Sequence, residues 1–435
     1  MKLSLKRTCV IFFIFLAIFD PPIFSFNIIF ILLPVSLIYV FIHTSGKLKI
    51  CGQITLGGAI ILGYILVIVG LGMLFGEDSL LKNRIAVLYQ LFFLMPAQCI
   101  CAYAVCIYAK TNKLSRIDIY EMCIRAGVIE GILVIISFFV PNVRAFFLSI
   151  MINKAGKGVY TAIMNNDSAY RAYGFADSLL DTFGYGIGLL AGFCLLKEKK
   201  EIKTYVIMGV LLFSTAVNSR TGLAVFMLAL VIQYLSGFNE RKHKLKKYKE
   251  GIIITLIIIT AILVVTKTSL KESSTISWIT AGFESVYSII FHKEMSYRLG
   301  SMQGSLLTER FWVLPDGFIS IFLGRGHSIY DTRSILGINS DVGYINYIWI
   351  CGILGETVLL LFISLIFRKI YRKAITKYEK KIVIFISLAF FLVFIKGNIL
   401  THTAGTFITV LCIASFLGEL CDMEFADKYS HLLRS

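Results

Sequence analysis

The chain has 435 residues, of which 57% are hydrophobic and only 16% are charged, and its mean hydropathy is +0.80. This composition excludes an ordinary soluble protein, because too few polar residues remain to cover so much apolar surface in water. The net charge of +17 is typical of some nucleic-acid-binding proteins, but here the cations stand in short clusters between apolar runs, so we expect no nucleic-acid partner.

The apolar runs recur along the whole chain and predict an all-α polytopic membrane protein with one integral membrane domain, residues 1–435. A crossing helix needs about 20 residues, and about twelve runs approach that length. We expect transmembrane helices near residues 8–20, 23–42, 53–75, 84–108, 117–140, 173–196, 204–218, 221–237, 251–266, 343–367, 380–395 and 398–418. The first run resembles a signal peptide, but Asp20, Pro21 and an immediate second run favour a retained anchor.

The distribution of Lys and Arg predicts the orientation of these helices. With both termini in the cytosol, the cytosolic segments carry 27 Lys and Arg in 76 residues, and the opposite segments carry 15 in 121 residues. Positively charged loops stay in the cytosol, so an even number of helices with both termini inside satisfies the rule. Two long outward-facing loops then remain, at about 141–172 and 267–342.

The second outward loop contains an amphipathic stretch, residues 295–322. As a helix, this stretch would place Leu307, Phe311 and Phe318 on one apolar face, as an interfacial helix lying on the membrane does. Pro315 would begin or kink a helix there.

The ten cysteines lie in apolar runs or on the predicted cytosolic side, and no spacing resembles a metal site. We therefore expect neither a disulfide framework nor a metal, and we predict no cofactor.

The segments predicted to face outward contain residues suited to binding a lipid-linked diphosphate. Guanidinium groups bind phosphate oxygens in pairs and stay protonated, and a carboxylate or imidazole is needed to move a proton. The candidates are Arg171, Arg220, Arg298, Arg310, Arg325 and Arg333, with Asp341, His327 and His402 for proton transfer.

Each candidate also has a structural interpretation. Arg171 and Arg220 stand at the outer ends of predicted helices, where a cation can simply contact lipid headgroups, and Arg298 can be a solvated charge. Arg310 precedes an aromatic pair suited to anchoring in the headgroup layer. Asp341 stands where a carboxylate caps a helix, and His402 can be a packed, hydrogen-bonded side chain. A cation between two glycines, as in residues 324–326, is a weak indication of a ligand site.

Four short motifs, in this order along the chain, resemble the Wzy-type O-antigen and capsular polysaccharide polymerases, which are related to the O-antigen ligases. Residues 171–175 (RAYGF) resemble the Arg-to-Gly motif after the first outward loop, and residues 218–222 (NSRTG) resemble the Ser-Arg-(Thr/Ser)-Gly turn. Residues 310–326 resemble an Arg followed by an amphipathic segment ending in Gly-x-Gly. Residues 341–355 resemble a polar, Tyr-containing helix start, here with Tyr344, followed by Gly-Ile-x-Gly.

The resemblance implies a glycosyltransferase that joins undecaprenyl-diphosphate-linked oligosaccharide units at the outer face of a bacterial cytoplasmic membrane. It implies that Asp341, Arg220 and Arg310 are catalytic and that Arg171, Arg298, Arg325, His327, Tyr344 and His402 bind substrate. The ligases carry His-Asn where this chain has Asp341 and Val342, so either Asp341 replaces that His as the base or the base lies elsewhere. The implied partners are the lipid-linked substrate and membrane lipids, with a chain-length regulator and a flippase.

Two other functions stay open. A flippase for the same lipid-linked units also fits twelve spans, although the outward loops rather than the span centres hold most of the charge. A ligase that transfers glycan to another acceptor is the other alternative, which the change from His to Asp at position 341 disfavours.

Overall fold

The protein was analysed as a computed structural model, which describes residues 2–21, 27–44, 52–155, 174–176, 181–236, 312–329, 332–338, 340, 342–395, 397 and 404–417. Within these residues the chain is helical and contains no strand. The all-α class predicted from the sequence is therefore confirmed.

The described helices follow in chain order. They are α1 (Lys2–Phe19), α2 (Ile29–Thr44), α3 (Gly52–Phe75), the short η1 (Asp78–Leu80), α4 (Leu81–Leu88), the π-helical segment η2 (Tyr89–Leu94), α5 (Met95–Thr111), α6 (Arg116–Phe139), α7 (Pro141–Ala155), α9 (Asp181–Leu196), α10 (Ile202–Asn218), α11 (Arg220–Leu235), α15 (Phe318–Leu323), α16 (Arg333–Leu336), α17 (Gly343–Lys373), α18 (Lys377–Phe394) and α19 (Ala404–Leu417).

Eleven of the twelve apolar runs predicted to be helices are helical over most of their length, and the run at 251–266 lies outside the described residues. Among the described residues, four helices are long and apolar enough to cross a membrane: Leu56–Phe75, Asp78–Thr111, Arg116–Phe139 and Gly343–Lys373. Leu74 and Phe75 in the first of these are 76% and 84% exposed. Exposure of such large apolar side chains is unfavourable in water but not in lipid. The length and composition of these four helices thus fit a membrane protein.

Contacts between residues divide the chain into two compact units. Unit 1 comprises residues 1–20, 27–123 and 308–435, and unit 2 comprises residues 21–26 and 124–307. Helix α6 begins in unit 1 and continues into unit 2, and each unit is described by itself below.

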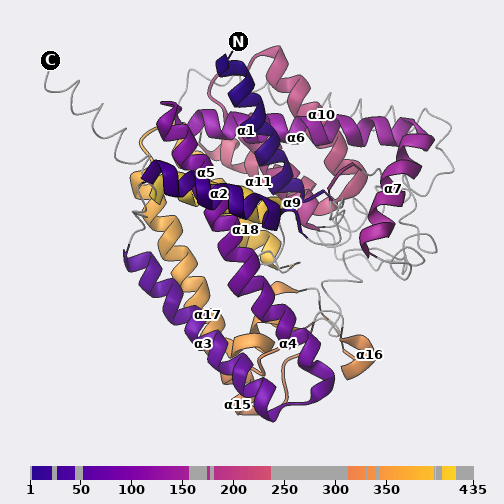
Figure 1. The fold of residues 1–435 in the computed structure, drawn as a ribbon, viewed down its shortest axis with the longest axis vertical. Coiled ribbons are helices and arrows are strands. Elements are labelled where there is room, and N and C mark those ends of the chain that lie inside the picture. Colours follow the sequence, from indigo (N-terminus) through magenta and orange to yellow (C-terminus); the bar gives the residue numbers. More distant parts are fainter. Residues whose placement is uncertain are drawn as a thin grey trace, which may run out of the picture. The chain divides into compact units, whose positions relative to one another are not determined.

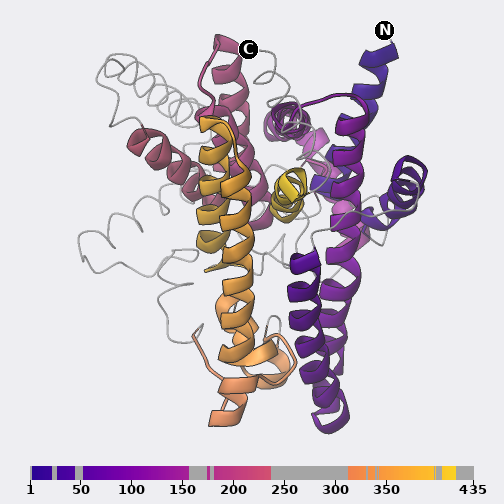
Figure 2. The same ribbon diagram turned by 90° about the vertical axis from the view of Figure 1, so that its left-hand side faces the viewer.

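In unit 1, α3 packs beside α17 and against α4 (Figures 1 and 2). Small residues permit the first contact, because a Cβ atom on Gly57 would lie 2.6 Å from the ring of Phe362 and one on Gly355 would lie 2.6 Å from the ring of Tyr64. Close approach through glycine is a common way for helices to pack in a membrane, where burial of apolar surface gives little driving force.

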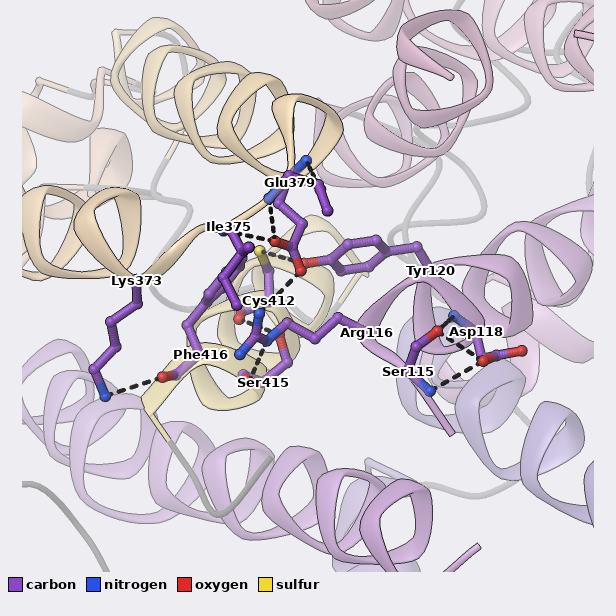
Figure 3. Close-up of polar contacts among 11 residues, drawn as sticks. Ser115, Arg116, Asp118, Tyr120, Lys373, Ile375, Glu379, Cys412, Ser415 and Phe416 are labelled. Atoms are coloured by element: carbon purple, nitrogen blue, oxygen red, sulfur yellow. Dashed lines mark hydrogen bonds and ion pairs between the residues drawn. The ribbon is translucent and has the colours of Figure 1, made fainter. Parts of the chain in front are cut away.

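A buried ion pair joins three helices at the start of α6 (Figure 3). The Arg116 Nη1 atom lies 2.9 Å from Glu379 Oε1, and Arg116 Nε donates to the Ser415 carbonyl at 3.0 Å. Glu379 also forms a capping box with Thr376, which fixes the first turn of α18. The pair therefore holds α6, α18 and α19 together on the predicted cytosolic side of unit 1.

In unit 2, α9 packs against both α10 and α11. Gly184 and Gly188 of α9 face Gly222 of α11, and a Cβ atom on Gly188 would lie 3.0 Å from the Gly222 Cα atom. Unit 2 also contains α7, a helix at the start of the first predicted outward loop, where Pro141 occupies the first helical position.

The predicted amphipathic stretch is described only from residue 312 onward. Residues 312–317 are not helical, and α15 begins at Phe318. Two residues account for this late start: Pro315 disfavours a helical residue before it, and Gly317 has a φ of 85°. The expected helix over residues 312–317 is therefore wrong, and residues 295–311 lie outside the described part.

Candidate functional site

The nine residues predicted to form the site are unevenly described. Arg325, His327 and Tyr344 are described with their side chains, and Arg220 is described as the first residue of α11. Arg171, Arg298, Arg310, Asp341 and His402 lie outside the described residues, although both chain neighbours of Asp341 are described.

The loop 324–327 in unit 1 docks on a break in α17. Gly352 has a φ of 68° and a ψ of 174°, which interrupts the helix and removes partners from the carbonyl groups of the preceding turn. The Arg325 N–H donates to the Trp349 carbonyl at 2.7 Å, and the Gly326 N–H donates to the Ile350 carbonyl at 3.1 Å. The loop therefore completes the hydrogen bonding of the broken helix.

Two glycines make this docking possible. Gly324 has a φ of 89°, and a Cβ atom there would lie 2.6 Å from the Gly352 nitrogen. Gly326 has a φ of 73°, and a Cβ atom there would lie 2.7 Å from the Ile68 carbonyl oxygen of α3. A side chain at either position would be both strained and obstructed. The Gly-Arg-Gly pattern, a weak indication in the sequence, thus fixes a cation between α3 and α17.

The Arg325 side chain lies over an aromatic platform. Its guanidinium carbon is 5.3 Å from the centre of the Trp349 ring, and its Nη2 atom donates to the Asp316 carbonyl at 2.9 Å. Trp349 is itself fixed, because its indole N–H donates to the Val313 carbonyl at 2.8 Å. The guanidinium is therefore held in a defined orientation over the ring.

His327 is 1% exposed and lies 5.4 Å, ring centre to ring centre, from Trp349. The pKa of His327 is lowered from 6.5 to about 4, mainly by burial. The hydrogen bond with the Ser328 carbonyl opposes this shift, the positive charges of Arg84 and Arg325 add to it, and Glu77 opposes it. The imidazole is therefore neutral at pH 7 and is a weak base. It can donate or accept a hydrogen bond there but adds no positive charge.

Asn346 connects this loop to the start of α17. Its Oδ1 atom accepts from Ser328 Oγ at 2.6 Å and from the Ile329 N–H at 3.1 Å. Its Nδ2 atom donates to the carbonyls of Ser340 at 2.8 Å and Val342 at 2.9 Å. These two residues flank Asp341 in the chain. One buried amide therefore holds the segment after His327 next to the segment that contains Asp341.

Tyr344 serves helix packing in this structure. Its hydroxyl donates to the Phe391 carbonyl of α18 at 3.1 Å, and its ring meets Phe394 edge-on at 4.6 Å between ring centres. The hydroxyl predicted to bind substrate thus has a backbone partner within unit 1.

In unit 2, Arg220 directly follows the turn between α10 and α11. Asn218 ends α10, Ser219 is extended with a φ of −153°, and Arg220 begins α11. Asn218 and Ser219 are 1% and 3% exposed. Neither the Asn218 amide atoms nor the Ser219 hydroxyl has a hydrogen-bond partner among the described residues. Ser219 packs against Gly184, near the first turn of α9.

Residues 174–176, which follow Arg171 closely, are fixed by a buried carboxylate. Glu130 of α6 is 0% exposed, and its two oxygens accept from the N–H groups of Phe175 and Ala176, each at 3.1 Å. Gly174 is pressed against the same carboxylate, and the Phe175 ring lies 4.9 Å from that of Phe147 in α7. Glu130 therefore fixes the backbone of residues 174–176, shortly after Arg171 in the chain.

Sequence reasoning missed four buried polar residues: Arg84, Glu130, Asn346 and Glu356. Glu130 and Glu356 stand inside predicted spans, where an ionisable residue is itself an indication of function. Glu356 is 6% exposed, and its Oε1 atom has no hydrogen-bond partner within the described part of the chain. Where the structure describes the chain, no group of three or more His, Cys, Asp or Glu is arranged to hold a metal ion.

No protein-family model matches the chain, and a comparison with curated proteins finds no relative.

Proposed function

We propose that the chain is a polymerase of lipid-linked oligosaccharides, with twelve transmembrane helices and both termini in the bacterial cytosol. The donor is a glycan on undecaprenyl diphosphate, and the acceptor is a hydroxyl of the next lipid-linked unit. The acceptor oxygen forms a bond to the anomeric carbon of the donor, whose bond to the diphosphate oxygen breaks. The diphosphate leaves with the electron pair, and the hydroxyl proton passes to the base.

The turn at Arg220 is the observation that carries this proposal. A cation at the first position of a 16-residue helix stands at the positive end of the helix dipole, where anionic groups are favoured. The buried amide of Asn218 and hydroxyl of Ser219 have no hydrogen-bond partners among the described residues, so they are available to a ligand oxygen. Fixed donors and cations stabilise the charge that develops on a leaving diphosphate.

The other residues take the roles that the resemblance implies. Arg310 and Arg171 hold the diphosphate together with Arg220, and Asp341 accepts the proton. Arg298, Arg325, His327, Tyr344 and His402 contact the lipid-linked units, with Arg325 presented on Trp349 as a fixed cation. His327 is the weaker candidate for the base, because its low pKa leaves it little affinity for a proton at neutral pH.

A flippase is the second candidate, and Glu356 favours it. This carboxylate lies four residues after the break at Gly352, inside a helix long enough to cross a membrane. Broken helices with a buried charge are a feature of transporter sites near the middle of the bilayer. A ligase is the third candidate, and no contact among the described residues favours it over the polymerase.

Deletion of the gene in its native host distinguishes these functions. Single units that reach the outer face, with the polymer ladder lost, identify a polymerase. Units trapped on the cytosolic side identify a flippase, and full-length polymer left on its lipid carrier identifies a ligase.

Complementation then tests the site. Arg220→Ala at normal protein level is expected to reduce polymer formation by about a hundredfold or more, as loss of one transition-state contact does. Lys82→Ala removes an exposed cation on the same predicted side and is the matched control, for which we expect full activity. Full activity of Arg220→Ala would remove Arg220 from the site.

A further inference from the structure

Helix α17 turns back on itself at its break. Before the break, the Tyr344 hydroxyl donates to the Phe391 carbonyl of α18 at 3.1 Å. After the break, the Phe367 ring lies 6.4 Å from the ring of the same Phe391, measured between ring centres. In a continuous helix Tyr344 and Phe367 would be about 35 Å apart, too far for both to reach one residue. The break therefore folds residues 343–351, the first arm, back toward residues 353–373, the second arm.

The second arm begins with a carboxylate that has no partner. Glu356 lies in the first turn after the break and is 6% exposed. Its Oε1 atom accepts no hydrogen bond, and no Lys, Arg or His among the described residues forms an ion pair with it. Glu130, by contrast, accepts two backbone N–H groups. Because a buried carboxylate without a positive charge is costly, Glu356 requires a charge that the described residues do not provide.

The first arm places polar side chains near this carboxylate but no cation. Tyr344, Tyr347 and Cys351 are close enough to interact electrostatically with Glu356. The Tyr344 hydroxyl and the Cys351 thiol already donate to backbone carbonyls. Tyr347 is 0% exposed, and its hydroxyl has no hydrogen-bond partner where the structure describes the chain. The two arms therefore bring an unpartnered carboxylate and an unpartnered phenol hydroxyl into the same buried region.

The helices that pack on α17 supply no charge there either. Tyr64 of α3 lies against Gly355, and its hydroxyl donates to the carbonyls of Leu323 and Cys351 at 3.2 Å each. On α18, Phe394 packs its ring against both tyrosines of the first arm. These neighbours are apolar or already hydrogen-bonded, so a positive charge on Glu356 comes from a ligand.

The chemistry of the two groups limits what that ligand is. One carboxylate and one hydroxyl offer oxygen atoms and a single negative charge. A divalent cation usually takes several carboxylates, and no group of three or more His, Cys, Asp or Glu in the described ranges can hold a metal ion. Buried carboxylates and broken helices within membranes are typical of proteins that bind protons or Na⁺. A small monovalent cation therefore fits best.

We propose that Glu356 and Tyr347 form a binding site for a monovalent cation, a proton or Na⁺, where the two arms of α17 meet. The site goes beyond the polymerase, because the proposed reaction uses no cation there. A bound cation cancels the charge of Glu356 and so stabilises the folded-back first arm. That arm carries Trp349, the platform on which Arg325 lies.

Dicyclohexylcarbodiimide, an apolar reagent for protonated carboxyl groups, tests the site in the purified full-length protein in detergent. The carboxyl oxygen bonds to the carbodiimide carbon and the carboxyl proton moves to nitrogen. Rearrangement then gives a stable N-acylurea, which peptide mass spectrometry locates. In choline chloride without Na⁺ we expect an adduct on Glu356 and none on Glu379, whose side chain is 3% exposed but is paired with Arg116 at 2.9 Å.

Addition of NaCl identifies the ion. If the ion is Na⁺, a concentration about ten times the dissociation constant leaves about a tenth of the sites empty and lowers the adduct about tenfold. Tyr347→Phe is then expected to weaken this protection. If the ion is a proton, NaCl has no effect and the adduct declines as the pH is raised. Absence of an adduct on Glu356 without Na⁺ at every pH, or equal adducts on Glu356 and Glu379, would overturn the site.

Glu356→Gln provides a second, independent measurement. Glutamine keeps the shape of the side chain without its charge and so mimics the cation-bound state. We expect this variant to unfold at or above the midpoint of the unmodified protein in choline chloride, and to lose any effect of NaCl on that midpoint. A lower midpoint, or failure to fold, would show that the ionised carboxylate has a protein partner and would overturn the inference. Arg220→Ala is expected to lose polymerisation and keep the adduct on Glu356, which separates this inference from the polymerase.

Discussion

The ion pair between Arg116 and Glu379 offers a stringent test of the helix packing in unit 1. Both side chains are almost fully buried, at 1% and 3% exposed, and the Arg116 guanidinium also lies 4.5 Å from the centre of the Phe416 ring (Figure 3). Arg116→Met leaves a buried carboxylate without its cation, and Glu379→Gln leaves a buried guanidinium without its anion. Either change is expected to cost about 3–5 kcal/mol of unfolding free energy, as for other buried pairs.

The double variant makes this reasoning specific. Arg116→Met with Glu379→Gln leaves no buried charge, and the glutamine oxygen still accepts the N–H groups of Ile375 and Thr376 that Glu379 Oε2 accepts now. We therefore expect the double variant to be more stable than either single variant, with a coupling free energy of about 2 kcal/mol or more.

Thermal unfolding in detergent, followed with a thiol-reactive dye, measures these effects. Cys123 and Cys412 are buried in unit 1, so dye labelling there reports loss of packing. A loss of 3–5 kcal/mol in a protein of this size is expected to lower the apparent unfolding midpoint by roughly 3–6 °C. Arg7→Gln is the control, because the Arg7–Asp118 pair is 38% and 39% exposed, and exposed pairs contribute little. The argument would be refuted if the single variants had the same unfolding midpoint as the control, or if the double variant had a lower midpoint than both single variants.

Two further predictions concern the loop that docks on α17. Asn346→Leu removes four hydrogen bonds and is expected to lower the unfolding midpoint and make residues 328–342 more sensitive to limited proteolysis. Asn83→Ala removes an amide whose contact with the Ser328 carbonyl is long, at 3.5 Å, and is expected to leave cleavage unchanged. The low pKa of His327 predicts that the protein becomes less stable as the pH falls below 6.5. Above pH 6.5 the imidazole is neutral in both the folded and the unfolded chain, whereas between pH 6.5 and about 4 only the unfolded chain binds the proton. This difference lowers the free energy of unfolding by up to about 3 kcal/mol. His327→Gln should flatten this part of the profile of unfolding midpoint against pH, and an unchanged slope would show that other groups cause it.

Apolar runs predicted most of the helices but not their irregularities. The run expected at 53–75 is helical from Gly52 to Phe75, because an uninterrupted apolar stretch of that length has few alternatives in a membrane. The run expected at 343–367 continues to Lys373, since Arg and Lys at a helix end are good helix formers and interact favourably with the helix dipole. The π-helical segment Tyr89–Leu94 and the break at Gly352 depend on side-chain packing, which apolar periodicity does not report.

The residues that position the predicted site are harder to recognise in the sequence, for a related reason. The arginines predicted to face outward stand out in the sequence because they are polar residues beside apolar runs. The residues that position them do not stand out: Asn346 is one amide in a run of mixed character, and Glu130 is one carboxylate in an apolar helix. Their importance comes from partners that are distant in the chain, such as Phe175 for Glu130 at a separation of 45 residues.

The break at Gly352 shows how contacts between residues distant in the chain position charged and polar side chains. A continuous helix would satisfy its own carbonyl groups, and the loop 324–327 would have no backbone partners on α17. With the break, the Trp349 and Ile350 carbonyls accept the loop, and the Cys351 carbonyl accepts the Tyr64 hydroxyl at 3.2 Å. The cation Arg325 is therefore held by backbone hydrogen bonds rather than by an ion pair, which leaves its charge available to an outside anion. A substitution that restored a regular helix at position 352, such as Gly352→Ala, should release the loop and remove Arg325 and His327 from Trp349 together.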